Sequence, residues 1–180
     1  MVKLHFSIII RAPREKVWKT MLADATYRQW TEEFAIGSHY IGDWSEGSRM
    51  LFLAPGEQGE TGMVSRIAAN RPFDLLSIQH LGVMKDGIED TSSEEMTSWS
   101  GAMEEYRFRE VEGDTEVLVD TDTTEEYRKM FQSVWPKALR KLKVLAEAGE
   151  KRITRKRVNP EVVLPRGSGT SKMDAISRNT

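Results

Sequence analysis

The stretch from about Glu125 to Gly149, EEYRKMFQSVWPKALRKLKVLAEAG, constrains the fold more than any other part of the chain. Its apolar residues recur at steps of three and four, which predicts a long helix with one broad apolar face. They are Tyr127, Met130, Phe131, Val134, Trp135, Ala138, Leu139, Leu142 and Leu145. A glycine after the last apolar turn is a common end of a helix, and Gly149 has that position. Such a face has to be buried against a wide apolar surface.

Pro136 lies in the middle of this predicted helix. A proline removes one backbone hydrogen bond and usually kinks the helix that contains it. We therefore expect a long helix that does not pack densely along its whole length, and hence a cavity between it and its partner surface.

The segments before this helix show mainly the period of two that indicates strands. Residues 2–10 alternate and predict a half-buried strand. Pro13 suits the start of a short helix over 13–22, and Asp24 is a candidate N-cap for a second short helix. From Gly37 onward, strands are predicted at 38–44, 48–53, 61–71, 73–81, 98–111 and 115–124, with residues 82–95 as a polar connection.

This order predicts an α+β fold in which a curved antiparallel sheet of about six to seven strands wraps around the C-terminal helix. A chain of 180 residues suggests one domain, which we place at 1–149. Residues 150–180 are polar and net basic, and we expect a flexible tail there. The domain itself is net acidic, within an overall formal charge of −2, which argues against DNA as a partner.

Other features of the sequence bear on the cellular compartment in which the protein is expected. No apolar run reaches the roughly 20 residues of a transmembrane helix. The N-terminal MVKLHFSIII lacks the features of a signal peptide, and the chain has no cysteine. We therefore expect a cytoplasmic protein without disulfides.

Three segments carry a resemblance to a known family. They are IRAPREKVWKTMLADATYRQW (10–30), IGDWSEGSRMLF (41–52) and VWPKALRKLKVLAEAG (134–149). With the strand order, they resemble the helix-grip fold of the START-like, or SRPBCC, superfamily. Within it they resemble the family related to the C-terminal domain of the activator of the heat-shock chaperone ATPase. The resemblance implies a cavity between sheet and helix, often holding an apolar small molecule, but it implies no particular reaction.

Candidate ligand-binding residues come from the elements that would surround this cavity. Methionines adapt to irregular ligands, and a few polar groups among apolar walls orient them. The candidates are Trp30, Tyr40, Met50, Phe52, Met63, Gln79, Trp99, Met103, Phe131 and Trp135. The alternative for each is an ordinary core or core-edge position, because a shift of one residue in a strand inverts the face.

The sequence offers little catalytic chemistry. It has no nucleophile elbow, P-loop or dinucleotide-binding fingerprint. The three histidines lack metal-binding spacing, so we expect neither a metal site nor a cofactor. Adjacent acidic pairs, such as Glu104 and Glu105, face opposite ways on a strand. Glu105 and Tyr106 are the nearest candidates for acid–base chemistry, and we assign no catalytic residue.

Three functions fit these patterns. The leading one is a carrier or receptor for a small apolar or amphipathic molecule. The second is an enzyme of cyclase or dehydratase type that uses the same cavity. The third is an interaction module that regulates a chaperone. An exposed strand edge or Trp44 could also support a homodimer.

Overall fold

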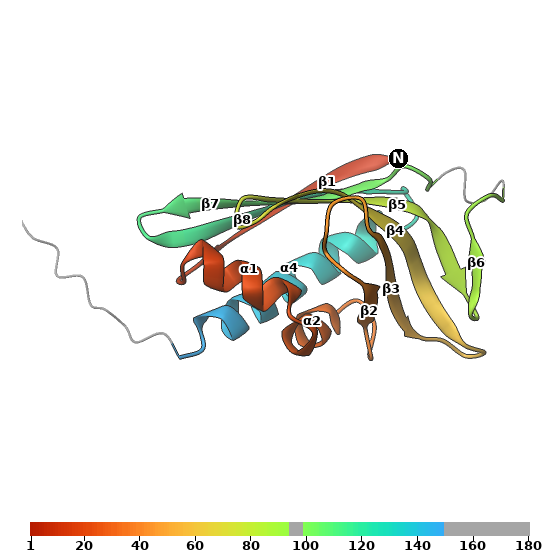
Figure 1. The fold of residues 1–180 in the computed structure, drawn as a ribbon, viewed down its shortest axis with the longest axis horizontal. Helices are drawn as coiled ribbons and strands as arrows, with labels where there is room; N and C mark the ends of the chain where they lie inside the picture. Colours follow the sequence, from red (N-terminus) through yellow and green to blue (C-terminus); the bar gives the residue numbers. More distant parts are fainter. Residues whose placement is uncertain (94–98, 150–180) are drawn as a thin grey trace, which may run out of the picture. The chain divides into compact units, whose positions relative to one another are not determined.

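The computed structural model describes residues 1–93 and 99–149. The predicted tail (150–180) lies outside the described residues. The helices and strands belong to the unit Met1–Glu150. In this unit the helices α1, α2 and α4 all lie on one face of a single bent sheet (Figure 1).

The sheet is antiparallel, with the order β1-β8-β7-β5-β4-β3-β2, and β6 pairs with β5 off this path. Its strands are β1 (Val2–Ile10), β2 (His39–Gly42), β3 (Arg49–Pro55), β4 (Glu60–Arg71), β5 (Leu75–Lys85), β6 (Ile88–Asp90), β7 (Met103–Val111) and β8 (Asp114–Thr123). The predicted α+β class, antiparallel sheet and strand order are confirmed. The connection predicted over 82–95 is wrong in part, because β5 continues to Lys85 and β6 follows it.

Two irregularities in the pairing of β4 with β5 bend the sheet. The register shifts between Val64 and Ser65 and again between Ile67 and Ala69. Because Ser65 pairs with His80 and Val64 with Gly82, Leu81 has no partner on β4. Such a bulge kinks the strand and increases its local twist. The sheet therefore curves towards its helical face, where a cavity can form.

The two short helices directly after the first strand are also confirmed. Helix α1 (Arg14–Leu22) begins after Pro13, and α2 (Asp24–Thr31) follows it. The N-cap of α2 is Ala23, so the prediction of Asp24 in that role is wrong. The Asp24 carboxylate instead accepts hydrogen bonds from Arg28 Nε at 2.9 and 3.0 Å, one helical turn later.

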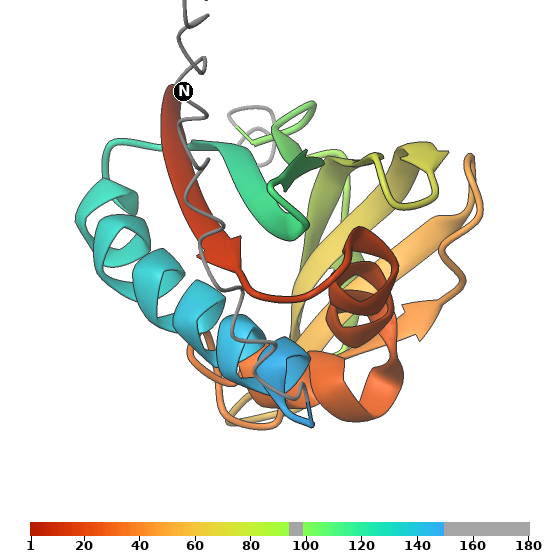
Figure 2. The same cartoon turned by 90° about the vertical axis from the view of Figure 1, so that its left-hand side faces the viewer.

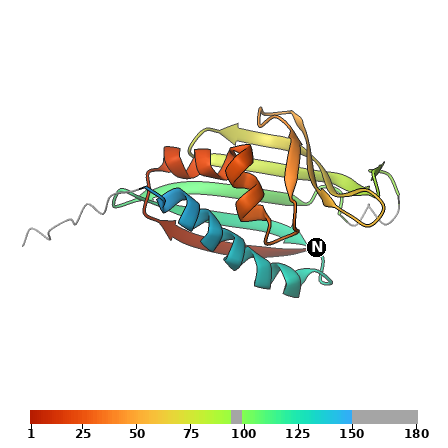
Figure 3. The same cartoon turned by 90° about the horizontal axis from the view of Figure 1, so that it is seen from below.

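Helix α4 (Arg128–Glu147) crosses the concave face of the sheet and packs against β1, α1 and α2 (Figures 2 and 3). It continues through Pro136, whose missing N–H leaves the carbonyl of Gln132 without its helical donor. Gln132 lies on the exposed side, where water can bind that carbonyl. After the helix, Gly149 has the left-handed φ of +79° that favours glycine at this position.

One ion pair fixes the C-terminal end of α4 to the chain after β1. The carboxylate of Glu147 accepts a hydrogen bond from the backbone N–H of Arg11 at 2.8 Å and another from its guanidinium at 2.9 Å. The hydrogen bond with Arg11 lowers the pKa of Glu147 to about 2. The end of the helix is thus held firmly over the sheet.

Truncating α4 on its buried face should destabilise the domain strongly. Leu142 is fully buried, so Leu142→Ala should cost about 2–5 kcal/mol in the free energy of unfolding through lost burial and a residual cavity. The neighbouring Val144 is 69% exposed, and Val144→Ala should change stability by less than about 0.5 kcal/mol. Urea denaturation measures both values. Equal effects of the two substitutions would contradict the packing described for α4.

Candidate functional site

A cavity of about 600 Å³ lies between the concave face of the sheet, α2 and the N-terminal half of α4. Most of its wall is aromatic or aliphatic. The aromatic members are Tyr27, Trp30, Phe34, Trp44, Phe52, Trp99, Tyr106, Tyr127, Phe131 and Trp135. This size lies within the range of cavities that enclose small organic ligands.

The cavity exists because α4 packs unevenly. Its C-terminal half buries Ala138, Leu139 and Leu142 almost completely against the core. Tyr127, directly before the helix, and Met130 and Phe131 in its N-terminal half line the cavity, and Trp135 lines it while also packing in the core. Met130 and Tyr127 remain about 40% exposed.

Six of the ten sequence-predicted residues line the cavity: Trp30, Phe52, Met63, Trp99, Phe131 and Trp135. Tyr40 and Met50 do not, although Met50 belongs to β3, which contributes Phe52 to the wall. The Tyr40 ring packs edge-on against Tyr27, and its hydroxyl donates a hydrogen bond to the carbonyl of Leu22 at 3.0 Å. Met50 is completely buried in the core.

Gln79 and Met103 also lie outside the lining, for a different reason. They are direct partners across β5 and β7, and they share the outer face of the sheet. The Gln79 side chain accepts a hydrogen bond from Arg66 there. Trp44, considered for a dimer contact, belongs to the cavity wall, where its ring packs against Tyr40 and Phe52.

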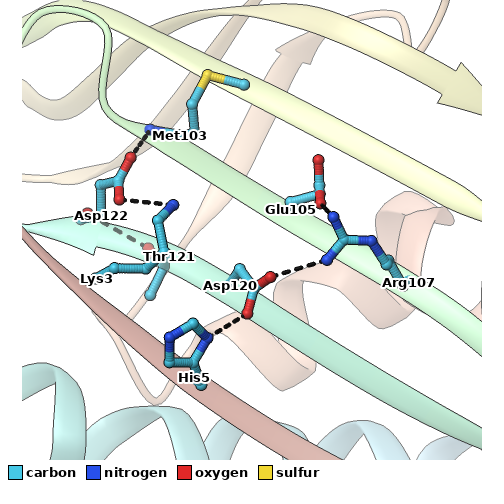
Figure 4. Close-up of polar contacts among 8 residues, drawn as sticks. All are labelled: Lys3, His5, Met103, Glu105, Arg107, Asp120, Thr121 and Asp122. Carbon is cyan, nitrogen blue, oxygen red and sulfur yellow. Dashed lines mark hydrogen bonds and ion pairs between the residues drawn. The ribbon is translucent and has the colours of Figure 1, made fainter.

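The acidic pair on β7 divides between the two faces of the sheet. Glu104 lines the cavity. Glu105 lies on the outer face, where it pairs with Arg107, which in turn pairs with Asp120 and through it with His5 (Figure 4). The prediction that Glu105 is a candidate for acid–base chemistry in the cavity is therefore wrong. The carboxyl group that lines the cavity belongs to Glu104.

Glu104 is the central polar group of the cavity. The hydroxyl of Tyr106 donates a hydrogen bond to Oε1 at 2.5 Å, and Oε2 lies 3.9 Å from Nε2 of His80. Only 19% of the Glu104 side chain is exposed. Burial raises the pKa of Glu104 to about 7, although the hydrogen bond from Tyr106 acts in the opposite direction. A carboxyl group of this kind exchanges protons near neutral pH.

His80 lies beside this carboxyl group but does not neutralise it. Its Nδ1 is 2.9 Å from the hydroxyl of Ser65, and burial lowers the pKa of His80 to about 4. The imidazole is therefore uncharged at neutral pH. From the sequence, Tyr106 was predicted as a candidate for acid–base chemistry, whereas Glu104 was named only as a member of an adjacent acidic pair.

Two further polar atoms of the wall have no hydrogen-bond partner in the described part of the chain. They are the indole nitrogens of Trp44 and Trp135. Trp135 is only 1% exposed, and an unpaired buried N–H is costly. Residues 1–93 and 99–149 contain no group of three or more side chains that could hold a metal ion.

A curved antiparallel sheet that encloses a cavity with a long C-terminal helix defines the START-like, helix-grip class of proteins. The chain has this fold, as the comparison with solved structures shows. It matches the Aha1 dimer structure from Colwellia psychrerythraea with a TM-score of 0.60 and 21% identity, over 84% of this chain and 100% of that one. The fold expected from the sequence resemblance is therefore confirmed.

Two other solved structures are similar at lower identity. Protein MLL2253 from Mesorhizobium loti has a TM-score of 0.62 and 13% identity, over 83% of this chain and 100% of that one. DynU16, from the dynemicin biosynthetic locus, has a TM-score of 0.57 and 12% identity, over 82% of this chain and 48% of that one. No protein-family model and no curated protein matches the sequence. No helix among the described residues is long and apolar enough to cross a membrane.

Replacing Glu104 should change how stability depends on pH. The raised pKa means that ionising Glu104 in the ligand-free fold is unfavourable, so the wild type loses stability as the pH rises from about 4.5 through about 7. Glu104→Gln removes this loss. The variant should be more stable than the wild type above about pH 7, by at most about 3 kcal/mol, and the difference should vanish below about pH 4.5.

Urea denaturation at a series of pH values measures this difference. His80 is present in both proteins, so its own destabilising effect at acid pH cancels in the comparison. Glu105→Gln, on the outer face, serves as the matched control and should keep the wild-type slope. A Glu104→Gln difference that is constant with pH would contradict the buried position of the carboxyl group.

Proposed function

We propose that this protein binds a small apolar or amphipathic molecule in the cavity between the sheet and α4. The observation that carries the proposal is the cavity itself, about 600 Å³ in volume and walled largely by aromatic side chains. Protein interiors are normally packed as densely as organic crystals. A hollow of this size in a small domain is difficult to account for as ordinary packing.

The distribution of polar groups supports an amphipathic ligand. Binding sites for small molecules are mostly apolar and contain a few placed polar groups. Glu104, Tyr106 and His80 form such a group in the wall. Each could hydrogen-bond a ligand while the aromatic rings cover its apolar body.

Filling the cavity should weaken binding. Val83 lies in the wall, so Val83→Trp should reduce the affinity for the uncharged fluorescent probe N-phenylnaphthylamine by about tenfold or more, because the indole takes the space of the probe. Val144→Trp, which adds the same ring to an exposed site on α4, should leave the affinity unchanged. Fluorescence titration measures both. Saturable binding that is equally strong in Val83→Trp would contradict a site in this cavity.

An enzyme of cyclase or dehydratase type is the second candidate, and Glu104 is the observation that favours it. A general acid or base works best with a pKa near the working pH, and that of Glu104 is about 7. If the protein turns over aromatic polyketide-like substrates, Glu104→Gln should lower kcat by about 100-fold or more, whereas Glu105→Gln should not. Unchanged turnover in Glu104→Gln would remove this carboxyl group from the chemistry.

A chaperone-regulating role and a homodimer remain weaker proposals. The similar structure from Colwellia psychrerythraea is an Aha1 dimer, but its 21% identity supports the fold alone. One fold hosts many functions. Trp44, proposed for a dimer contact, lies in the cavity wall in this chain.

A further inference from the structure

The charges in the cavity wall are unbalanced. Among the described lining residues, Lys85, Glu104 and Asp122 carry a formal charge. The carboxylate of Asp122 is already compensated, because it lies 2.9 Å from Lys3 Nζ and accepts the backbone N–H of Met103 at 3.0 Å (Figure 4). Lys85 is exposed and lies five residues beyond His80 on β5, a separation of about 16 Å along the strand.

Glu104 is thus a buried carboxyl group without a cationic partner among the residues that the structure describes. The titratable groups around it come from four elements: Tyr106 on β7, His80 on β5, Asp122 on β8 and Tyr27 on α2. The hydroxyl of Tyr106 donates to Oε1, and the uncharged imidazole of His80 lies beside Oε2. None of these groups supplies a positive charge at neutral pH.

Aromatic rings surround the same end of the cavity. The Tyr106 ring lies 5.9 Å from that of Trp135. Tyr27 is close enough for the charge of Glu104 to contribute to its raised pKa, and its ring lies 5.6 Å from that of Trp30. The faces of such rings attract cations, most strongly where water is excluded.

We propose that the cavity selects organic cations, and that its ligand is an amphipathic amine whose ammonium group binds between the Glu104 carboxylate and the neighbouring aromatic rings. This inference rests on the proposed function, because it names the chemical class of molecule bound at the same site. The ammonium ion supplies the charge that the wall lacks. The apolar part of the ligand fills the remaining, largely hydrophobic volume.

Charge balance favours an amine over a neutral or an acidic ligand. A buried carboxylate is unfavourable without a partner, and an opposite charge within a few ångströms makes its ionised form favourable again. A neutral ligand would leave that cost in place. An acidic ligand would add a second negative charge. Binding of an amine should therefore displace a proton from Glu104.

Two ligands of nearly the same shape test the inference: naphthylmethylamine, which is cationic, and naphthylmethanol, which is neutral. At about pH 8 the wild type should bind the amine about tenfold or more tightly than the alcohol. The preference should decline towards pH 5, where the Glu104 carboxyl group is protonated. Calorimetry near pH 7 in buffers of different ionisation enthalpy should show proton release with the amine and none with the alcohol.

Glu104→Gln should lose the preference and the proton release while still binding the alcohol, and Glu105→Gln should keep both. Equal affinities for the two ligands in the wild type, or a preference that survives in Glu104→Gln, would overturn the inference and leave the proposed function intact. If neither ligand nor the uncharged probe binds, the cavity is not a small-molecule site, and the proposed function falls together with the inference.

Discussion

The packing of α4 against the core is the interaction on which the rest of the structure depends. Ala138, Leu139 and Leu142 are almost fully buried, and each larger side chain of this kind contributes roughly 1.5–3 kcal/mol through burial. The bonds between Arg11 and Glu147 hold the same end of the helix. Because this half is packed so completely, part of the other half can face a cavity without loss of the fold, although Trp135 there is also buried in the core. The C-terminal half of α4 thus mainly stabilises the fold, and its N-terminal half also forms part of the candidate site.

The alternation of a β-strand explains how a charged group comes to lie inside this hydrophobic region. Phe108 and Tyr106 bury their rings on the inner face of β7, and the same period of two places Glu104 there. Glu105 faces outward and pairs with Arg107 (Figure 4). Two carboxyl groups next to each other in the chain therefore have different environments. The charge of Glu105 is screened by water and by Arg107. The charge of Glu104 lies in an interior of low dielectric constant, where it interacts strongly with any molecule in the cavity.

Much of the fold could be predicted from the sequence, because long periodic segments such as 2–10 and 125–149 determine element type and order. The inner face of each strand was harder to predict. Met103 was expected to face inward, although it lies five residues from the buried Phe108 and cannot share its face of one regular strand. Taking Phe108 as the reference would have placed Glu104 inside and Met103 outside. On β5, no local pattern signals the bulge at Leu81, since it depends on pairing with β4.

The cavity also makes stability and occupancy interdependent. An unfilled hollow forfeits the dispersion contacts that side chains would otherwise make across it, and larger residues at positions such as Ala54 or Val83 would restore them. The sequence instead surrounds the space with wide aromatic rings. A molecule that binds only the folded state stabilises it in proportion to the logarithm of its concentration. The contacts missing from the core of this domain are those that a bound ligand would supply.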